Sequence, residues 1–373
     1  MSAGAEPVVL VSAAEPSGDR AAARVVLQLR RNTDIRCFGI GGRHLAEVGV
    51  ALLRNIERDA SLGLADSARG LLRWSGIWAE LRDRIRTERP VAALLTDAPD
   101  FHLPLARVLR AAGVPVVYYI GPQVWAWRPG RLQLMRKRAD VTALILPFEK
   151  PLYDRAFAPA VFVGHPILDE PSPMQRESVR AALDLSSEDR LVALLPGSRQ
   201  GEIARHLPAM ADAARQFRAQ NIAAIAAPGS GIDVEVQHRF ADLRFLPRNL
   251  AARDLLSAAD AALVASGTAT LEATVARVPF AAVYRTDAVS FAVARHLLKL
   301  PYVALPNWIA GEKIVPELLQ NDVTGPRLFE TARLLLDEQV ASNQRFALRR
   351  IARSLGEPGA ARKTADLVLE RLR

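Results

Sequence analysis

Short apolar runs that end in turns of small residues recur along the whole chain. The clearest run covers residues 261–265, and Ser266, Gly267 and Thr268 follow it. A continuous apolar run of this length predicts a parallel strand that is buried on both faces. Apolar residues then return at helical spacing, at Leu271, Val275 and Val278. The segment therefore predicts a strand, a tight turn and a helix with one apolar face.

The same order of strand, turn and helix appears in both halves of the chain. Residues 7–12 predict a strand that leads through a turn at 14–19 into a helix, and residues 191–195 begin a second such unit. This alternation is typical of an open α/β domain with a parallel sheet. The segment 168–190 is rich in Pro, Glu, Asp and Ser, which is typical of an interdomain linker. We therefore expect two doubly wound, Rossmann-like domains.

Charge narrows the choice of partner. The 373 residues carry a formal net charge of +9, which favours an acidic partner such as nucleic acid, anionic lipid headgroups or phosphorylated sugars. The sequence has no zinc-finger spacing, no aromatic RNA-binding motif and no all-basic tail, and this argues against nucleic acid. Cys37 is the only cysteine, which excludes an internal disulfide and a zinc site built from several cysteines.

Hydropathy gives an expectation for the compartment. No apolar run approaches the roughly 18 residues that a transmembrane helix needs. The first residues carry no basic segment ahead of their short apolar run, unlike a secretory signal peptide. We therefore expect a cytoplasmic location.

One predicted helix, within residues 61–89, has an unusual surface. Its wide apolar face includes Trp74 and Trp78, and several arginines flank it. Two tryptophans one turn apart among arginines are typical of a helix that lies in a membrane interface. The alternative is a helix packed on the sheet, with arginine stems extended over its apolar edge. The pattern alone favours this second interpretation.

Two predicted turns favour the binding of an anion. The small residues 266–268 precede a helix, and a helix start offers unpaired N–H groups and partial positive charge. Glu272, one turn further on, could accept hydrogen bonds from ribose hydroxyls. The alternative is an ordinary helix cap. The second turn places Ser198 as a possible cap and Arg199 where a phosphate would meet the next helix.

A third turn carries candidates for proton transfer. Asp97, Asp100 and His102 follow the predicted strand 91–95, and ligands of open α/β sheets bind at the carboxyl ends of strands. Carboxylates and histidine are the usual general bases. Helix capping explains one of the two aspartates but not obviously both.

Nine motifs taken together resemble those of lipid-A-disaccharide synthases, two-domain glycosyltransferases whose GT-B fold consists of two facing Rossmann-like domains. The resemblance runs from about Val8 to the C-terminus. The motifs lie at residues 15–19, 39–42, 97–101, 124–128, 146–150, 163–166, 195–202, 265–272 and 305–307.

The resemblance implies a domain organisation. The N-terminal domain, which takes the acceptor and meets the membrane, is expected at 1–167 and to be completed by a C-terminal helix at about 345–373. The linker is expected at 168–190 and the UDP-sugar-binding domain at 191–344.

The resemblance also implies the reaction. A 2,3-diacylglucosamine unit moves from UDP-2,3-diacylglucosamine to 2,3-diacylglucosamine 1-phosphate, which gives a β-1,6-linked disaccharide 1-phosphate and UDP. The anomeric configuration inverts, so one displacement with a general base is expected. The family needs no metal or other cofactor. The expected partners are the two lipid substrates and the anionic inner face of the cytoplasmic membrane, with no nucleic acid; a homodimer is left open.

The resemblance implies a role for each residue that matches a position in the family's motifs. Asp97 is the expected base, with Asp100 in reserve. The UDP-sugar is expected to contact Arg199, Ser198, Ser266, Gly267, Thr268, Glu272 and Asn307. The acceptor side is expected to include Glu15, Ser17, Asp19, Trp127 and Arg128. With the resemblance taken into account, Trp74 and Trp78 become predicted membrane contacts.

Five residues depart from the family's usual pattern, all in the N-terminal half: Ala14 and Asp66, where Gly and Glu are usual, His102, where Asn is usual, and Gly121 and Gln123, where Ser is usual. The resemblance therefore predicts the UDP-sugar donor more firmly than the identity of the acceptor. The alternatives are a GT-B homologue with another acceptor, a UDP-sugar epimerase, and a UDP-binding peripheral membrane protein without turnover.

Overall fold

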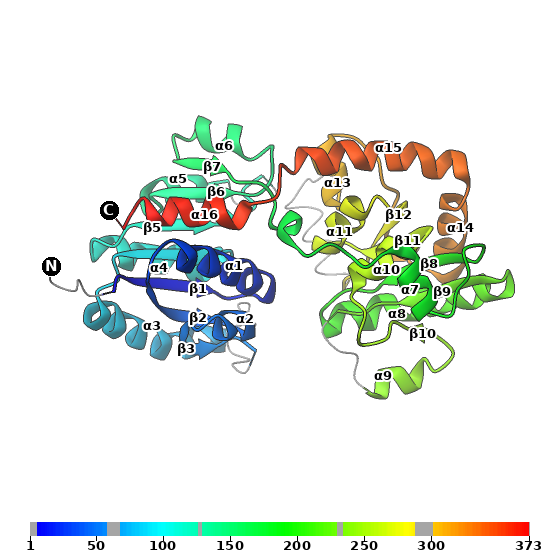
Figure 1. The fold of residues 1–373 in the computed structure, drawn as a ribbon, viewed down its shortest axis with the longest axis horizontal. Coiled ribbons are helices and arrows are strands. Elements are labelled where there is room, and N and C mark those ends of the chain that lie inside the picture. The colour runs from blue at the N-terminus through cyan, green and yellow to red at the C-terminus, as the bar shows by residue number, and fades with distance from the viewer. Residues whose placement is uncertain (1–5, 58–67, 126–128, 230–233, 288–300, 373) are drawn as a thin grey trace. The chain divides into compact units, whose positions relative to one another are not determined.

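The computed structural model describes residues 6–57, 68–125, 129–229, 234–287 and 301–372, with the side chains of residues 68–75 and 234 left aside (Figure 1). The chain forms two compact units, one of residues 1–169 with 355–373 and one of residues 170–354. Each unit is described by itself below.

The first unit is built on a parallel sheet in the strand order β3-β2-β1-β4-β5-β6-β7. The order reverses between β1 and β4, which are neighbours, and ligands of such sheets bind at this reversal. The strands are β1 (Val8–Ala13), β2 (Arg36–Gly41), β3 (Ala51–Asn55), β4 (Ala92–Thr96), β5 (Val116–Tyr119), β6 (Val141–Leu144) and β7 (Ala160–Phe162).

Helices cover both faces of this sheet, as the alternation of side chains in β1 requires. Leu10 packs in one core cluster with α3, α4 and α5, whereas Val9 and Val11 pack in the other with α1 and α16. The helices are α1 (Pro16–Asn32), α2 (Arg43–Glu47), α3 (Ala68–Glu88), α4 (Pro99–Ala111), α5 (Arg131–Arg138), α6 (Lys150–Arg155), the short 3₁₀ helix η1 (Pro166–Asp169) and α16 (Ala360–Leu369).

The C-terminal helix α16 returns to the first unit and lies beside α1 (Figure 1). Asp169 attaches it, because its carboxylate accepts hydrogen bonds from the N–H groups of Gly359 and Ala361 at 2.5 and 2.8 Å. The return begins at Leu355 and not at about 345, since α15 (Glu338–Ser354) belongs to the second unit.

The second unit repeats the architecture with a parallel sheet in the order β10-β9-β8-β11-β12-β13, which reverses between β8 and β11. Its strands are β8 (Arg190–Leu195), β9 (Ile222–Ala226), β10 (Arg244–Phe245), β11 (Ala261–Ala265), β12 (Phe280–Tyr284) and β13 (Glu317–Leu319). Its other helices are α7 (Arg176–Ala182), α8 (Gln200–Ala219), α9 (Val234–Arg239), α10 (Ala252–Ala258), α11 (Thr268–Ala276), α13 (Leu305–Ala310), η2 (Gln320–Asp322) and α14 (Gly325–Leu335).

The segment 168–190 is not the free linker that its composition predicts. It contains α7, whose Val179 is fully buried in a core cluster of the second unit. Arg180 is also buried, and its guanidinium donates hydrogen bonds to the carbonyl oxygens of Ser186, Ala258 and Asp189. The polar composition therefore reflects a helix that is fixed by backbone contacts.

None of the helices in the described part of the chain is both long enough and apolar enough to span a membrane.

Candidate functional site

Asp97 lies at the reversal point of the first sheet, in a strained turn. It follows β4 directly, and both Asp97 and Ala98 have positive φ, 56° and 43°. Such a conformation costs on the order of 1–3 kcal/mol for each residue and persists only where neighbouring contacts enforce it. Helix α4 begins immediately afterwards at Pro99. The turn thus holds Asp97 at the carboxyl end of a central strand.

Two buried side chains hold this turn through the carbonyl oxygen of Asp97. The hydroxyl of Tyr118 donates to it at 2.7 Å, and Nδ1 of His102 lies 2.7 Å from it. Nε2 of His102 lies 2.8 Å from the hydroxyl oxygen of Ser12 on β1. Because a carbonyl oxygen only accepts, Nδ1 carries the proton and Nε2 accepts from Ser12.

His102 is therefore a positioning residue. It is fully buried, and burial lowers its pKa to about 4, so the ring is neutral at physiological pH. Both ring nitrogens are occupied by the turn and by β1. The sequence places His102 beside the two aspartates, but its link to Ser12 spans 90 positions and has no local signal.

We predict that His102→Leu lowers kcat about 10- to 100-fold, because the turn loses a hydrogen bond and small displacements of a catalytic group are costly. His102→Asn, which restores the family's usual residue, should recover most of the loss because its amide can donate to the same carbonyl. The KM for the donor should stay unchanged in both variants. Equal kcat values for the Leu variant and the wild type would contradict this role.

The same burial predicts a pH dependence of stability. The folded-state pKa of His102 lies below its ordinary value of 6.5, so the unfolded chain binds a proton first as the pH falls. The contribution of His102 to stability is therefore present above pH 6.5 and decreases toward pH 4. Urea unfolding from pH 7 to 5 should show a smaller loss for His102→Asn than for the wild type; identical slopes would be the contrary result.

The start of α1 lies against the Asp97 turn, as expected for neighbouring strands at the reversal point. Gly18 marks how closely they pack, because a Cβ there would be in van der Waals contact with Cβ of Asp97 at 3.7 Å and Cγ2 of Thr96 at 3.4 Å. Glu15 is the residue before α1, and Ser17 is exposed in its first turn. The structure thus brings Glu15 and Ser17 to the edge of the sheet that carries Asp97.

Asp19, in contrast, has a structural role within the first unit, and its predicted contact with the acceptor stays a prediction. Its side chain is 1% exposed. Its carboxylate accepts hydrogen bonds from the N–H groups of Gly42, His44 and Leu45, at 2.6, 2.9 and 3.3 Å. It thereby caps α2, and a Cβ on Gly42 would lie 2.9 Å from it. The glycines after β2 make room for this carboxylate.

Asp100, the reserve base, forms an ion pair with Arg131. The side chain of Asp100 is 51% exposed, whereas that of Arg131 is 8% exposed. The pair fixes α5 to the first turn of α4. Of the other predicted residues in this half, Asp66, Trp127 and Arg128 lie outside the described residues.

The departure at Gly121 has a local cause. A Cβ at this position would lie 2.6 Å from the hydroxyl oxygen of Tyr153, which is buried. A serine there would therefore require Tyr153 to move. Gln123, two residues on, is exposed.

Trp78 is partly buried and packs on the core of the first unit, and its contact with a membrane stays a prediction. Its ring packs against Phe101 with centroids 5.2 Å apart, and it lies on a core cluster that includes Ile77 and Leu81 of the same helix. The interpretation of α3 as a helix packed on the sheet therefore holds at this position. The side chain of Trp74 lies outside the described residues.

We predict that Trp78→Ala lowers the free energy of unfolding by about 2 kcal/mol, because it leaves a cavity beside Phe101. Chemical denaturation measures this loss, and vesicle binding by the folded variant should not change. Wild-type stability with weakened vesicle binding would instead support the membrane contact.

In the second unit, two turns leave neighbouring strands at the carboxyl edge. Arg199 precedes α8 after β8, and Gly267 precedes α11 after β11. The φ of Gly267 is 146°, which favours glycine. Gly267 and Thr268 are exposed, and Glu272 lies partly buried one turn further along α11. The first N–H groups of a helix lack helical acceptors, so this edge can receive an anion.

The turn before α8 is shaped by Glu202. Its carboxylate lies 3.3 Å from the N–H nitrogen of Ser198 and 3.6 Å from the guanidinium of Arg199. Arg199, and not Ser198, is the residue at the cap position, and the carboxylate of Glu202 accepts from its backbone N–H at 3.5 Å, so the prediction of Ser198 as the cap is wrong. The side chain of Arg199 is 74% exposed.

His206, a residue that the sequence analysis did not single out, holds this turn from behind. It is buried, its Nδ1 lies 2.8 Å from the carbonyl oxygen of Pro196, and its Nε2 accepts from the N–H of Arg285 at 2.9 Å. It thus joins the turns after β8 and β12.

Two residues predicted to contact the UDP-sugar form hydrogen bonds within the chain. The N–H of Ser266 donates to the carbonyl oxygen of Val283 at 2.9 Å, and its hydroxyl donates to the carbonyl oxygen of Val303 at 3.0 Å. Asn307 is fully buried. Its amide nitrogen donates to Val315 and Glu317, and its oxygen accepts from two backbone N–H groups. These groups therefore hold their own loops, and their contact with the UDP-sugar stays a prediction.

No group of three or more His, Cys, Asp or Glu side chains within the described ranges is arranged to hold a metal ion.

Known proteins resemble this chain across both units. The family profile described as lipid-A-disaccharide synthetase matches residues 9–369 and so covers both. The chain belongs to this family. Two lipid-A-disaccharide synthases agree: that of Anaeromyxobacter dehalogenans (strain 2CP-C) is 41% identical, with 97% of this chain and 96% of the relative covered. That of Myxococcus xanthus (strain DK1622) is 39% identical, with 98% of each covered.

Solved structures support the fold of this family member. MurG of Acinetobacter baumannii has a TM-score of 0.62 at 16% identity, over 98% of this chain and 99% of that one. A UDP-GlcNAc 2-epimerase of Neisseria meningitidis, bound to UDP-GlcNAc, has a TM-score of 0.64 at 11% identity, over 97% and 99%. The predicted fold class, GT-B with two Rossmann-like domains, is confirmed.

Proposed function

We propose that this chain is an inverting glycosyltransferase that moves 2,3-diacylglucosamine from its UDP donor to 2,3-diacylglucosamine 1-phosphate, with the lipid A disaccharide 1-phosphate and UDP as products. The observation that carries the proposal is the family match over residues 9–369. It includes the Asp97 turn of the first unit and both anion-binding turns of the second.

Asp97 acts as the general base. Its carboxylate removes the proton of the acceptor 6-hydroxyl while that oxygen attacks the anomeric carbon of the donor, and the bond to the UDP oxygen breaks. The strained turn, held through its carbonyl by His102 and Tyr118, supports this role because it fixes the carboxylate before substrate binds. Preorganised positioning of this kind lowers the barrier.

Arg199 and the first N–H groups of α11, at Gly267 and Thr268, stabilise the negative charge that develops on the diphosphate of UDP. Glu272 binds the ribose. Exposure of Arg199 and of the first turn of α11 supports this assignment, as does their position after neighbouring strands. The reaction proceeds without a metal or another cofactor in this proposal.

The enzyme acts at the anionic inner face of the cytoplasmic membrane, to which it binds as a peripheral protein. Two lipid substrates and the net charge of +9 support this location.

The main alternative is an epimerase that acts on a UDP-sugar alone. It has support from the fold, since the Neisseria meningitidis neighbour is a UDP-GlcNAc 2-epimerase, although likeness of fold does not fix function. The release of UDP by the purified protein distinguishes the two. A transferase should release UDP from UDP-2,3-diacylglucosamine only when the acceptor is added. Formation of an isomeric UDP-sugar without acceptor would instead support the epimerase.

A further inference from the structure

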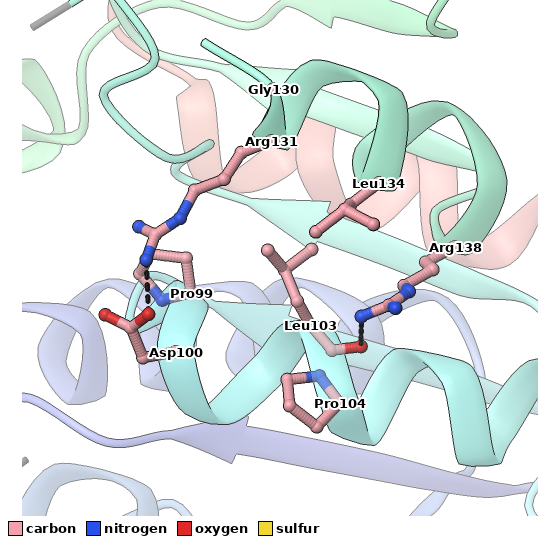
Figure 2. A pocket seen from close by; sticks show the side chains of 8 residues that line it. All are labelled: Pro99, Asp100, Leu103, Pro104, Gly130, Arg131, Leu134 and Arg138. Atoms are coloured by element: carbon pink, nitrogen blue, oxygen red, sulfur yellow. Dashed lines mark hydrogen bonds and ion pairs between the residues drawn. The ribbon is translucent and has the colours of Figure 1, made fainter. Parts of the chain in front are cut away.

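A groove runs between α4 and α5 of the first unit (Figure 2). Its volume is about 440 Å³. Two helical stripes face each other across it, with side chains three or four positions apart, so each stripe lies on one face of its helix. They are Asp100, Leu103 and Pro104 on α4, and Arg131, Leu134 and Arg138 on α5.

The groove changes character along its length. At one end Asp100 and Arg131 form an ion pair, which neutralises that end. The middle is apolar, with Leu103 buried and Leu134 partly exposed. At the other end Nη1 of Arg138 donates to the carbonyl oxygen of Leu103 at 3.1 Å (Figure 2).

Positive charge accumulates at this far end. Arg107 continues the α4 stripe one turn beyond Leu103 and Pro104. Burial lowers the pKa of Arg138, and the nearby positive charge of Arg107 lowers it further. Among the residues that the structure describes, neither has a carboxylate within ion-pair distance. A bound anion would offset these two positive charges.

The neutral end lies next to the proposed base. Asp100 is three positions after Asp97, in the first turn of α4. The helix rises about 10 Å from Asp100 to Arg107, at 1.5 Å per residue. A ligand that presents a hydroxyl to Asp97 can therefore extend along the groove and reach the two arginines.

We propose that this groove is the subsite for the phosphorylated lipid acceptor. The phosphate binds between Arg107 and Arg138, and the apolar part of the lipid lies over Leu103, Pro104 and Leu134. An apolar floor followed by two guanidinium groups is complementary to an amphiphile with one anionic group. The inference rests on the proposed function for the identity of the lipid.

Equilibrium binding without donor tests the groove independently of turnover. The probes are a water-soluble, short-chain 2,3-diacylglucosamine 1-phosphate and the same compound without phosphate. We expect the wild type to prefer the phosphorylated form by about 10- to 100-fold, as for hydrogen bonds to a charged group. Arg107→Gln with Arg138→Gln should remove this preference. The matched control, Arg136→Gln, changes an exposed arginine of the same helix and should keep it.

A second variant tests the apolar middle. Leu134→Asn should weaken the binding of both probes by a similar factor and leave their ratio unchanged. A preference for phosphate that survives the double Gln variant, or that the control loses equally, would overturn the proposal.

Two further measurements separate the possible causes. If the double Gln variant loses anionic-vesicle binding well beyond the control and keeps its preference for the phosphorylated probe, the arginines serve the membrane and the subsite is refuted. If the wild type binds the probe with the expected preference but forms no disaccharide, the proposed function fails while the lipid-phosphate groove stands.

Discussion

Asp97→Asn is expected to lower kcat for disaccharide formation by about 10²- to 10⁴-fold, the usual contribution of a general base. An asparagine has nearly the same shape and leaves the carbonyl oxygen of the turn in place, so His102 and Tyr118 keep their hydrogen bonds. The variant loses only the carboxylate that accepts the proton. Single-turnover kinetics with saturating donor and acceptor measures the loss directly.

UDP affinity is the control for this variant, because the proposed UDP contacts lie in the second unit, and it should stay at the wild-type value. Asp100→Asn provides a matched comparison. It weakens the ion pair with Arg131 and should affect acceptor affinity more than kcat. If Asp97→Asn turned over at the wild-type rate, Asp97 could not be the base; a large loss only in Asp100→Asn would transfer that role to Asp100.

Arg199→Ala is expected to lower kcat/KM for the donor by about 10²- to 10³-fold, comparable to the loss of one group that stabilises developing negative charge. Its side chain is 74% exposed at the carboxyl edge of the second sheet, and its removal leaves Glu202 in place at the start of α8. Steady-state kinetics with varied donor measures the effect. Part of the loss in kcat/KM should appear as a lower kcat, because the negative charge on the diphosphate increases as the bond to UDP breaks.

Arg205→Ala is the matched control for Arg199. Arg205 is exposed on the helix that follows Arg199, six positions further along the chain, and donates to the carbonyl of Gly201. It should change kcat/KM less than about threefold, as for a surface residue. Equal losses in the two variants would indicate a general effect of charge and would contradict a specific contact by Arg199.

The architecture was predictable because it depends on local patterns. Apolar runs such as 261–265 and 191–195 are buried strands, and the turns that follow them lie at the carboxyl edge. The position of Asp97 and Arg199 after strands at the reversal points follows from the same pattern. The exception is 168–190, because its polar side chains bind backbone groups of the second unit.

The roles of several polar residues were not predictable because their partners are distant in the sequence. Asp19 binds N–H groups 23 to 26 positions away, and the hydroxyl of Ser266 binds a carbonyl 37 positions away. Each stands in a motif near a strand end, where a ligand contact and a structural bond look alike. Burial distinguishes the two, and burial comes from tertiary packing.

Every role proposed for these residues depends on the formation of a disaccharide by this chain. The most direct measurement is mass spectrometry of the products after incubation, without added metal, with UDP-2,3-diacylglucosamine and 2,3-diacylglucosamine 1-phosphate. We expect a tetraacylated disaccharide monophosphate, formed in equal amount with UDP. Donor binding without any disaccharide would contradict the account and would point to a different acceptor or to a protein without turnover.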